Sequence, residues 1–173
     1  MLTPHAQTPD APAHAPDHES RVSDDHHESL RLWLRLLTCT ALIERNVRAA
    51  LRERFAITLP RFDLMAQLER HPKGLRMGEL SRRLMVTGGN VTGLTDQLVG
   101  EGMVERLPIP GDRRSHAVRL TAKGKAAFDA MAAEHERWIV GMLAGVSSAD
   151  RDRLYQLLGT LKSSLAAPAR GDA

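Results

Sequence analysis

The 173-residue sequence has a single cysteine and few aromatic residues, namely two Trp, one Tyr and three Phe. Because Cys39 stands alone, the chain can form neither an internal disulfide nor a zinc site built on several thiolates. No run of about eighteen apolar residues occurs, which excludes a membrane-spanning helix and a membrane partner. The first residues also lack the apolar core of a signal peptide, so we expect a cytoplasmic protein.

Patterns typical of enzymes and metal sites are missing as well. No paired carboxylates, Ser-His-Asp set or Cys-His pair stands in a recognisable context. His71, His116 and His135 are isolated, and we expect them at the surface. The run DDHHE at residues 24–28 has the residue types of a metal site but not the spacing, so we interpret it as a solvated run. We therefore predict no catalytic site, no metal and no cofactor.

Charge is distributed unevenly along the chain, although the net charge is only +3. Residues 1–29 carry six acids and one Arg, whereas residues 73–125 carry ten Lys and Arg against five acids. A local basic excess suits a polyanion partner, most simply nucleic acid. A solvated basic surface would account for the charge equally well, so charge alone does not decide between the two.

Leu, Ala and Arg dominate the composition, and apolar residues repeat at helical spacing over most of the chain. This pattern predicts helices at about residues 29–55, 60–71, 77–84, 88–102, 122–144 and 148–165. We divide the chain into a disordered acidic, His-rich tail (1–28), an N-terminal dimerisation helix (29–57), a head (58–121), C-terminal dimerisation helices (122–167) and a short tail (168–173).

The hydrophobic period changes after Gly102. Met103–Ile109 and Ser115–Thr121 alternate like strands and flank a basic turn at Pro110–Arg114, which predicts a β-hairpin. Thr121 is a suitable N-cap for the helix that follows. The expected fold class is therefore mainly α with one β-hairpin.

The segment VTGGNVTGLTDQLV, residues 86–99, raises a question. Its apolar residues fall on one helical stripe, yet Gly88, Gly89 and Gly93 each cost a helix about 1 kcal/mol relative to Ala. A nucleotide phosphate loop is a rival interpretation, but the segment lacks the Gly-Lys-Ser/Thr and the glycine spacing of such loops. The glycines are explained if another molecule approaches the helix backbone closely.

A short helix, a turn, a second helix and a hairpin with a basic tip predict a winged helix-turn-helix, whose second helix enters the DNA major groove. We expect Val91, Leu94 and Leu98 to anchor this recognition helix. Asn90 and Gln97 carry amides that can read adenine, and Thr92 can contact a thymine methyl group or a phosphate. The residues predicted to meet DNA from this helix are Thr87, Gly89, Asn90, Thr92, Gly93 and Gln97.

The segment MGELSRRLMVTGGNVTGLTDQLVGEGMVERLPIPGDRRSHAVRLTAKGKAAF, residues 77–128, resembles the MarR family of bacterial transcription regulators. PGDRR followed by VRLTAKG is the most specific part. The resemblance implies an obligate homodimer with interlocking first and last two helices, whose winged heads straddle a pseudopalindromic DNA operator. It also implies that Asp112 orients Arg114 into the minor groove, with Arg113 as an additional wing cation.

The stretch VTGGNVTGLTDQL is similar, more loosely, to family members that control hydroxycinnamate and other aromatic-acid catabolism. This similarity implies a repressor that an aromatic carboxylate or its acyl-CoA thioester releases from DNA. Apolar groups on the first, second and fifth helices, with arginines nearby, supply a plausible effector site. The residues proposed for it are Trp33, Leu37, Arg45, Phe62, Met65 and Trp138. Taken singly, each is better explained as core or as solvated surface.

Two alternatives stay open. One is an architectural DNA-binding protein without an effector, which an effector-induced loss of operator affinity would exclude. The other is a redox-sensing regulator that uses Cys39. Cys39 lies within LLTCTALIE on a largely apolar helix, and we favour a buried, inert thiol there, since no neighbour in the sequence clearly activates it.

Overall fold

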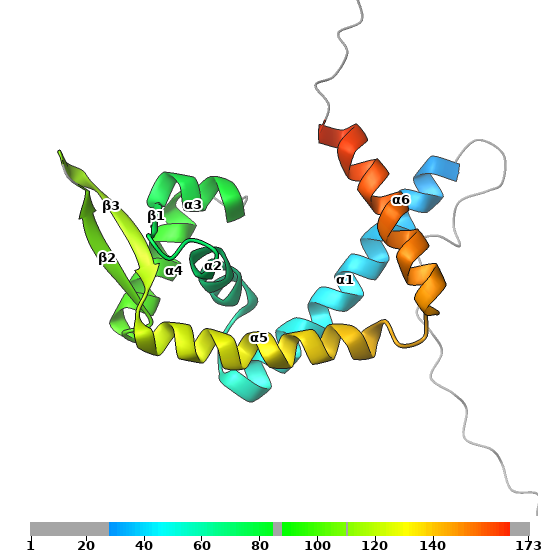
Figure 1. The fold of residues 1–173 in the computed structure, drawn as a ribbon, viewed down its shortest axis with the longest axis horizontal. Helices are drawn as coiled ribbons and strands as arrows, with labels where there is room; N and C mark the ends of the chain where they lie inside the picture. Colours follow the sequence, from blue (N-terminus) through cyan, green and yellow to red (C-terminus); the bar gives the residue numbers. More distant parts are fainter. Residues whose placement is uncertain (1–27, 85–87, 110, 167–173) are drawn as a thin grey trace, which may run out of the picture. The chain divides into compact units, whose positions relative to one another are not determined.

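The computed structural model describes residues 28–84, 88–109 and 111–166, which are mainly helical with a small antiparallel sheet (Figure 1). The elements in chain order are α1 (Glu28–Phe55), α2 (Leu59–Glu69), β1 (Leu75–Arg76), α3 (Met77–Leu84), α4 (Gly88–Gly100), β2 (Val104–Ile109), β3 (Asp112–Leu120), α5 (Ala122–Met142) and α6 (Ser148–Ala166). The chain divides between Asn46 and Val47 into two compact units, and each is described by itself.

The core of the second unit lies where α2, α3, α4 and the sheet meet. Leu64 of α2, Leu80 of α3 and Leu98 of α4 are fully buried there. Burying a side chain of this kind contributes roughly 1.5–3 kcal/mol. Helix α2 also packs against α5, where the rings of Phe62 and Phe128 stack with their centroids 5.5 Å apart. The core therefore fixes the positions of α3 and α4 relative to the sheet.

The sheet has three strands in the order β1-β3-β2, with β3 antiparallel to both neighbours. Leu75 of β1 is paired with Val118, and Val104 of β2 is paired with Leu120. Val118 is fully buried on the central strand. The hairpin of β2 and β3 confirms the predicted wing, whereas β1 was not predicted.

The hairpin is paired further toward its tip than the sequence suggested. β3 begins at Asp112, which is paired with Ile109, so Arg113 and Arg114 lie in the strand and the predicted turn at Pro110–Arg114 is wrong. Gly111 has a φ of 82°, a left-handed conformation that glycine adopts without strain. Such a residue allows the tight reversal that brings the two strands into register.

The junction between β3 and α5 is fixed by side-chain and backbone contacts. Thr121 accepts a hydrogen bond from the Gly124 N–H at 3.0 Å, which confirms its predicted role as an N-cap. Its hydroxyl also lies 2.7 Å from the Gly102 carbonyl oxygen, to which it donates. A Cβ at Gly124 would lie 1.8 Å from the Met103 carbonyl oxygen, so α5 starts against backbone that only glycine can approach.

Helices α1 and α6 carry apolar residues that nothing in the described part of the chain covers. The exposed ones are Leu30, Leu32, Trp33, Leu37 and Leu42 of α1, and Leu154, Tyr155, Leu157, Leu158, Leu161 and Leu165 of α6. Helix α6 has no buried residue. An uncovered apolar stripe of this length is typical of a helix that packs against another chain. None of the described helices is long and apolar enough to cross a membrane.

Cys39 of α1 is exposed, so the predicted burial of this thiol is wrong for the single chain. The prediction took the apolar residues around Cys39 as signs of a core. Two of those neighbours, Leu37 and Leu42, are themselves 50% and 44% exposed. An apolar helical segment indicates a buried face only where the same chain supplies the covering surface.

Candidate nucleic-acid interface

Helices α3 and α4 pack against each other, as the two helices of a helix-turn-helix do (Figure 1). Helix α4 has a buried inner face. Val91 and Leu98 are buried, as predicted, and Leu94 is half-buried. Thr95 is also fully buried, with its hydroxyl 3.9 Å from the sulfur of Met77 on α3. Sequence reasoning missed Thr95 because a polar residue interrupts the apolar pattern. These contacts leave the opposite face of α4 exposed.

The centre of that exposed face is bare backbone. Gly89, Gly93 and Gly100 follow one another at intervals of four and seven residues, so they lie on one stripe opposite the buried residues. A Cβ at any of the three would meet no described atom within 4 Å, and none of the three has a positive φ. The described part of the fold therefore gives no steric reason for glycine here. Bare backbone does let another molecule approach α4 closely.

Polar side chains flank this glycine stripe on two sides. Asn90 and Gln97, seven residues apart and exposed, lie along one flank, whereas Thr92 and Asp96 lie along the other. The Thr92 hydroxyl donates to the Gly88 carbonyl at 3.0 Å, and its lone pairs can still accept a hydrogen bond. The structure thus brings Asn90 and Gln97 together but separates Thr92 from them. The predicted base-reading residues do not form a single row.

Thr92 faces a basic hollow between α3, α4 and the sheet. The hollow has a volume of about 700 Å³ and is lined by Arg76, Met77, Gly78, Glu79, Arg82, Thr92, Arg106 and His116. Its three arginines come from β1, α3 and β2, so separate elements converge to make it positive. Guanidinium groups gathered in this way are suited to hold phosphate oxygens.

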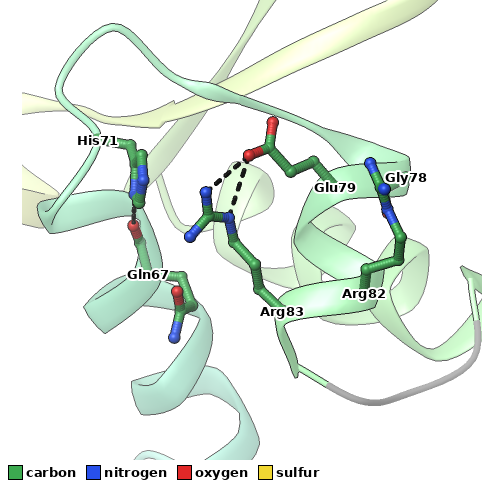
Figure 2. A network of polar contacts seen from close by, with 6 residues as sticks. All are labelled: Gln67, His71, Gly78, Glu79, Arg82 and Arg83. Carbon is green, nitrogen blue, oxygen red and sulfur yellow. Dashed lines mark hydrogen bonds and ion pairs between the residues drawn. The ribbon is translucent and has the colours of Figure 1, made fainter. Parts of the chain in front are cut away.

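The carboxylate in this lining is neutralised within α3, as Figure 2 shows. Arg83 donates to Oε1 of Glu79 through Nε at 3.1 Å and Nη2 at 2.8 Å. The hydrogen bond from Arg83 lowers the pKa of Glu79, so this carboxyl stays ionised and paired. Arg82 is directed away from that pair in Figure 2, and its Nε reaches the Gly78 carbonyl at 3.4 Å. Arg82 thus keeps its positive charge at the hollow.

An ion pair joins the recognition helix to the wing. Arg106 of β2 donates from Nη2 to Oδ1 of Asp96 on α4. On the wing itself, Arg119 pairs with Glu105 at 2.7 Å across the β2–β3 register. These exposed pairs contribute little stability. The Asp96 pair nevertheless links the outer side of α4 to the hairpin.

Several predicted DNA contacts fall where the structure gives no side-chain detail. Asp112, Arg113 and Arg114 lie in β3, but their side chains lie outside the described part, and Thr87 lies outside it altogether. Their roles stay predictions. Among the residues that the structure describes, no group of three or more His, Cys, Asp or Glu side chains is arranged to hold a metal ion.

The residues proposed for an effector fall into separate groups. Phe62 and Trp138 are linked through His135, which lies 5.1 Å from the first ring and 6.4 Å from the second, between centroids. Of the three histidines expected at the surface, His116 is exposed, whereas His135 and His71, which follows α2, are half-buried. Met65 is fully buried and lines a different cavity.

Trp33, Leu37 and Arg45, the remaining three, lie on the first unit, where all are exposed. The proposed effector site therefore stays a prediction, supported in part by the grouping of Phe62 with Trp138 through a shared neighbour.

Comparison with known proteins identifies the family to which this fold belongs. The model of the MarR family matches residues 57–116. The HTH-type transcriptional regulator PecS of Dickeya dadantii is 29% identical over 65% of this chain and 69% of its own length. The transcriptional activatory protein BadR of Rhodopseudomonas palustris is 30% identical over 66% of each chain. The crystal structure of a MarR family transcriptional regulator from Silicibacter pomeroyi is 34% identical, with a TM-score of 0.70 over 83% of this chain and 99% of that one.

Proposed function

Because this chain belongs to the MarR family of DNA-binding transcriptional regulators, we propose that it is a ligand-responsive repressor that binds a pseudopalindromic operator as a homodimer. We further propose that an aromatic carboxylate or its acyl-CoA thioester releases it from DNA. The observation that carries the DNA-binding part of the proposal is the glycine stripe of Gly89, Gly93 and Gly100, an open backbone surface with amide side chains along one flank.

In the proposed DNA complex, α4 lies in the major groove with the glycine stripe against the DNA. Asn90 and Gln97 read base edges from one flank. Thr92 and the arginines of the basic hollow hold phosphates on the other. The wing enters the neighbouring minor groove with Arg113 and Arg114, which supply affinity more than sequence choice. Such a protein works where the DNA is, which supports a cytoplasmic location.

The homodimer is supported by the apolar residues that α1 and α6 leave exposed. We assign residues 29–57 and 122–167 to dimerisation and residues 58–121 to the DNA-binding head. A dimer presents two recognition helices, and these must reach successive major grooves about 34–36 Å apart. Anything that changes the spacing of the two heads therefore changes operator affinity.

Effector release then follows as a population shift. A ligand bound beside the head favours a head spacing that does not match the operator, and it acts only through its stronger binding to that state. The aromatic group of Phe62, His135 and Trp138 is one surface that an aromatic ligand can contact. Arg54 lies over the Trp138 ring at 5.9 Å and adds a cation beside it.

A second candidate function rests on the exposure of Cys39. An accessible thiol can be oxidised, and oxidation on a dimerisation helix would alter the same head spacing. An architectural protein without an effector is the third possibility. Titration of the operator complex with hydroxycinnamates, benzoates and their CoA thioesters separates the three. An oxidant that acts on the wild type but not on Cys39→Ser would replace the ligand proposal.

The DNA-binding mode is tested by selecting operator sequences from random duplexes with the full-length protein. We expect a two-fold symmetric consensus. Asn90→Ala and Gln97→Ala should relax base choice at particular positions, because a bidentate hydrogen-bonded pair discriminates against the wrong base by about 1–3 kcal/mol. Equal weakening of operator and random DNA would show that these amides only position the protein. A reporter fused to the operator decides between repression and the activation that the name of BadR indicates for that relative.

A further inference from the structure

The acidic segment that precedes α1 has no part in the proposed function, and its charge is opposite to that of the DNA-binding head. Residues 1–29 carry six acids and one Arg, whereas residues 73–125 carry ten Lys and Arg against five acids. Residues 1–27 lie outside the described part of the chain, but their charge and length follow from the sequence. Two conditions decide whether the segment can bind the head, namely unpaired positive charge there and sufficient reach.

The basic hollow between α3, α4 and the sheet contains positive charge that no described carboxylate neutralises. Arg76 is exposed and forms no ion pair within the described part of the chain. Arg82 donates from Nε to the Gly78 carbonyl at 3.4 Å and likewise has no carboxylate partner among the described residues. The nearby carboxylates of Glu79 and Asp96 are each paired with another arginine. An anion that enters the hollow therefore meets two guanidinium groups without breaking an existing pair.

The acidic segment is long enough to reach the head. Helix α1 runs without interruption from the first compact unit into the second, and the part from Glu28 to Val47 is about 28 Å long. Glu19 lies nine residues before Glu28 and Asp10 lies eighteen residues before it. An extended chain of these lengths spans about 30–60 Å. The acids from Asp10 to Glu19 can therefore extend back along α1 and beyond the point where the second unit begins.

We propose that the acidic segment, residues 10–19, docks in the basic hollow of its own chain and competes there with DNA phosphates. The hollow has a volume of about 700 Å³, which gives room for a short stretch of chain. Asp17 and Glu19 are two residues apart, so an extended stretch presents both carboxylates on one side, toward Arg76 and Arg82. The proposal rests on the proposed function for the task of the hollow and adds a competitor that the chain itself carries.

The competition has a defined size and a defined lack of sequence preference. A few exposed ion pairs bind weakly, but a segment of the same chain meets the hollow at an effective concentration that reaches the millimolar range. The segment therefore competes by a small factor, which is largest at low salt because salt screens exposed charges. Operator and random DNA both place phosphates in the hollow, so both must displace the segment. The segment lowers the two affinities by the same factor and leaves their ratio unchanged.

Docking is tested without DNA on the full-length protein, with a nitroxide label attached at Ala15→Cys in a Cys39→Ser background. At low salt the label should broaden the backbone amide NMR signals of residues that line the hollow, among them Gly78, Thr92 and His116. High salt should restore these signals. A triple variant without the acids of the segment should lose the broadening, and it carries Asp10→Asn, Asp17→Asn and Glu19→Gln. No broadening at the hollow at low salt, or equal broadening in the triple variant, would overturn the proposal.

Fluorescence anisotropy with operator and random duplexes measures the competition. At low salt the triple variant should bind both duplexes about threefold to tenfold more tightly than the wild type, and the gain should vanish at high salt. The matched control removes three exposed carboxylates from α1, α5 and α6 and should bind like the wild type; it carries Glu53→Gln, Glu136→Gln and Asp152→Asn.

Equal tightening in both triple variants would show that only the net charge matters, and it would overturn the proposal. The labelling experiment contains no DNA, so it decides the docking contact by itself. A failure to select a symmetric operator would reject the proposed regulator, whereas missing broadening at the hollow would reject the docking of the acidic segment.

Discussion

The middle of this chain and its two ends use the same apolar residues in opposite ways. Every buried hydrophobic residue in the described part lies between Val47 and Met131, whereas every large exposed one lies before Val47 or after Met131. Leu64 and Leu158 both belong to regular amphipathic helices, yet the first is fully buried and the second is 39% exposed. Amphipathic spacing therefore identifies a face that will be covered, but not the chain that covers it.

The division follows the tasks of the two regions. A recognition surface must be held rigidly, so the core behind α4 is complete within one chain. In the proposed regulator, the spacing between the two recognition surfaces must be adjustable, so it depends on an interface between two copies of the chain. A change in that interface reaches both heads together, which is why a regulator of the proposed kind can respond to a small ligand.

Breaking the interface should have the largest effect. Leu158 and Leu161 lie on one stripe of α6, and Leu158→Glu combined with Leu161→Glu should leave a folded monomer at micromolar concentration, because two charges would be buried without partners. Sedimentation velocity measures the mass, and operator affinity should fall with it, since one head binds one half-site. Gln156→Glu places one negative charge on the opposite side of α6 and should stay dimeric. If the double variant stayed dimeric, α6 would not be part of the dimer interface.

A pair of truncations sharpens the comparison. Leu64→Ala should lower the free energy of unfolding by about 2–5 kcal/mol, since it opens a cavity in the core of one chain. Its cost should not depend on protein concentration. Leu165→Ala, at a position 76% exposed in the single chain, should cost less, and only at concentrations where the dimer forms. Urea unfolding at two protein concentrations distinguishes these cases, and concentration-independent costs for both would contradict the division.

The fold could be predicted from the sequence because the main sequence signals for it are local. The stripe of Val91 and Leu98 is visible within one helix, and the capping role of Thr121 depends on the three residues that follow it. β1 escaped because two residues are too few to show alternation, and its pairing partner Val118 lies far along the chain. The burial of Cys39 was predicted wrongly, since an apolar pattern does not show whether the same chain or another one packs over it.

The candidate interface was predictable in its residue types but not in its arrangement. The glycines and amides of α4 could be recognised from the sequence, and helical periodicity could have shown that Thr92 and Asn90 face different ways. The Asp96–Arg106 pair depends on how the hairpin packs beside α4, which no local pattern gives. The Arg61–Glu101 pair likewise joins residues that only the packed core brings together.

Alanine substitutions at two exposed glycines, one in each region, allow a direct comparison of the regions. Gly93 of α4 and Gly159 of α6 both have room for a Cβ, so Gly93→Ala and Gly159→Ala should each raise helix stability, by up to about 1 kcal/mol. Thermal unfolding measures this gain. Only Gly93→Ala should weaken operator binding, because its methyl group stands between the α4 backbone and the DNA. Unchanged affinity in that variant would mean that the glycine stripe does not touch DNA.

The smallest expected effect concerns the pH dependence of the head. The hydrogen bond from Arg83 lowers the folded-state pKa of Glu79 below its ordinary value of 4.5. A carboxyl with a depressed folded pKa contributes stability above its unfolded pKa, and this contribution is lost as the pH falls through the folded value. Glu79→Gln should therefore be slightly less stable than the wild type at neutral pH and equal to it in acid. Because the pair is exposed, the difference should be small and should shrink in high salt.

The difference is measured from urea midpoints at pH values above and below the range in which carboxyl groups titrate. Asp152→Asn, on the exposed helix α6, removes the same charge away from the Glu79–Arg83 pair and is the matched control. A loss of stability in Glu79→Gln that persists in acid would assign Glu79 a packing role instead of an ion pair.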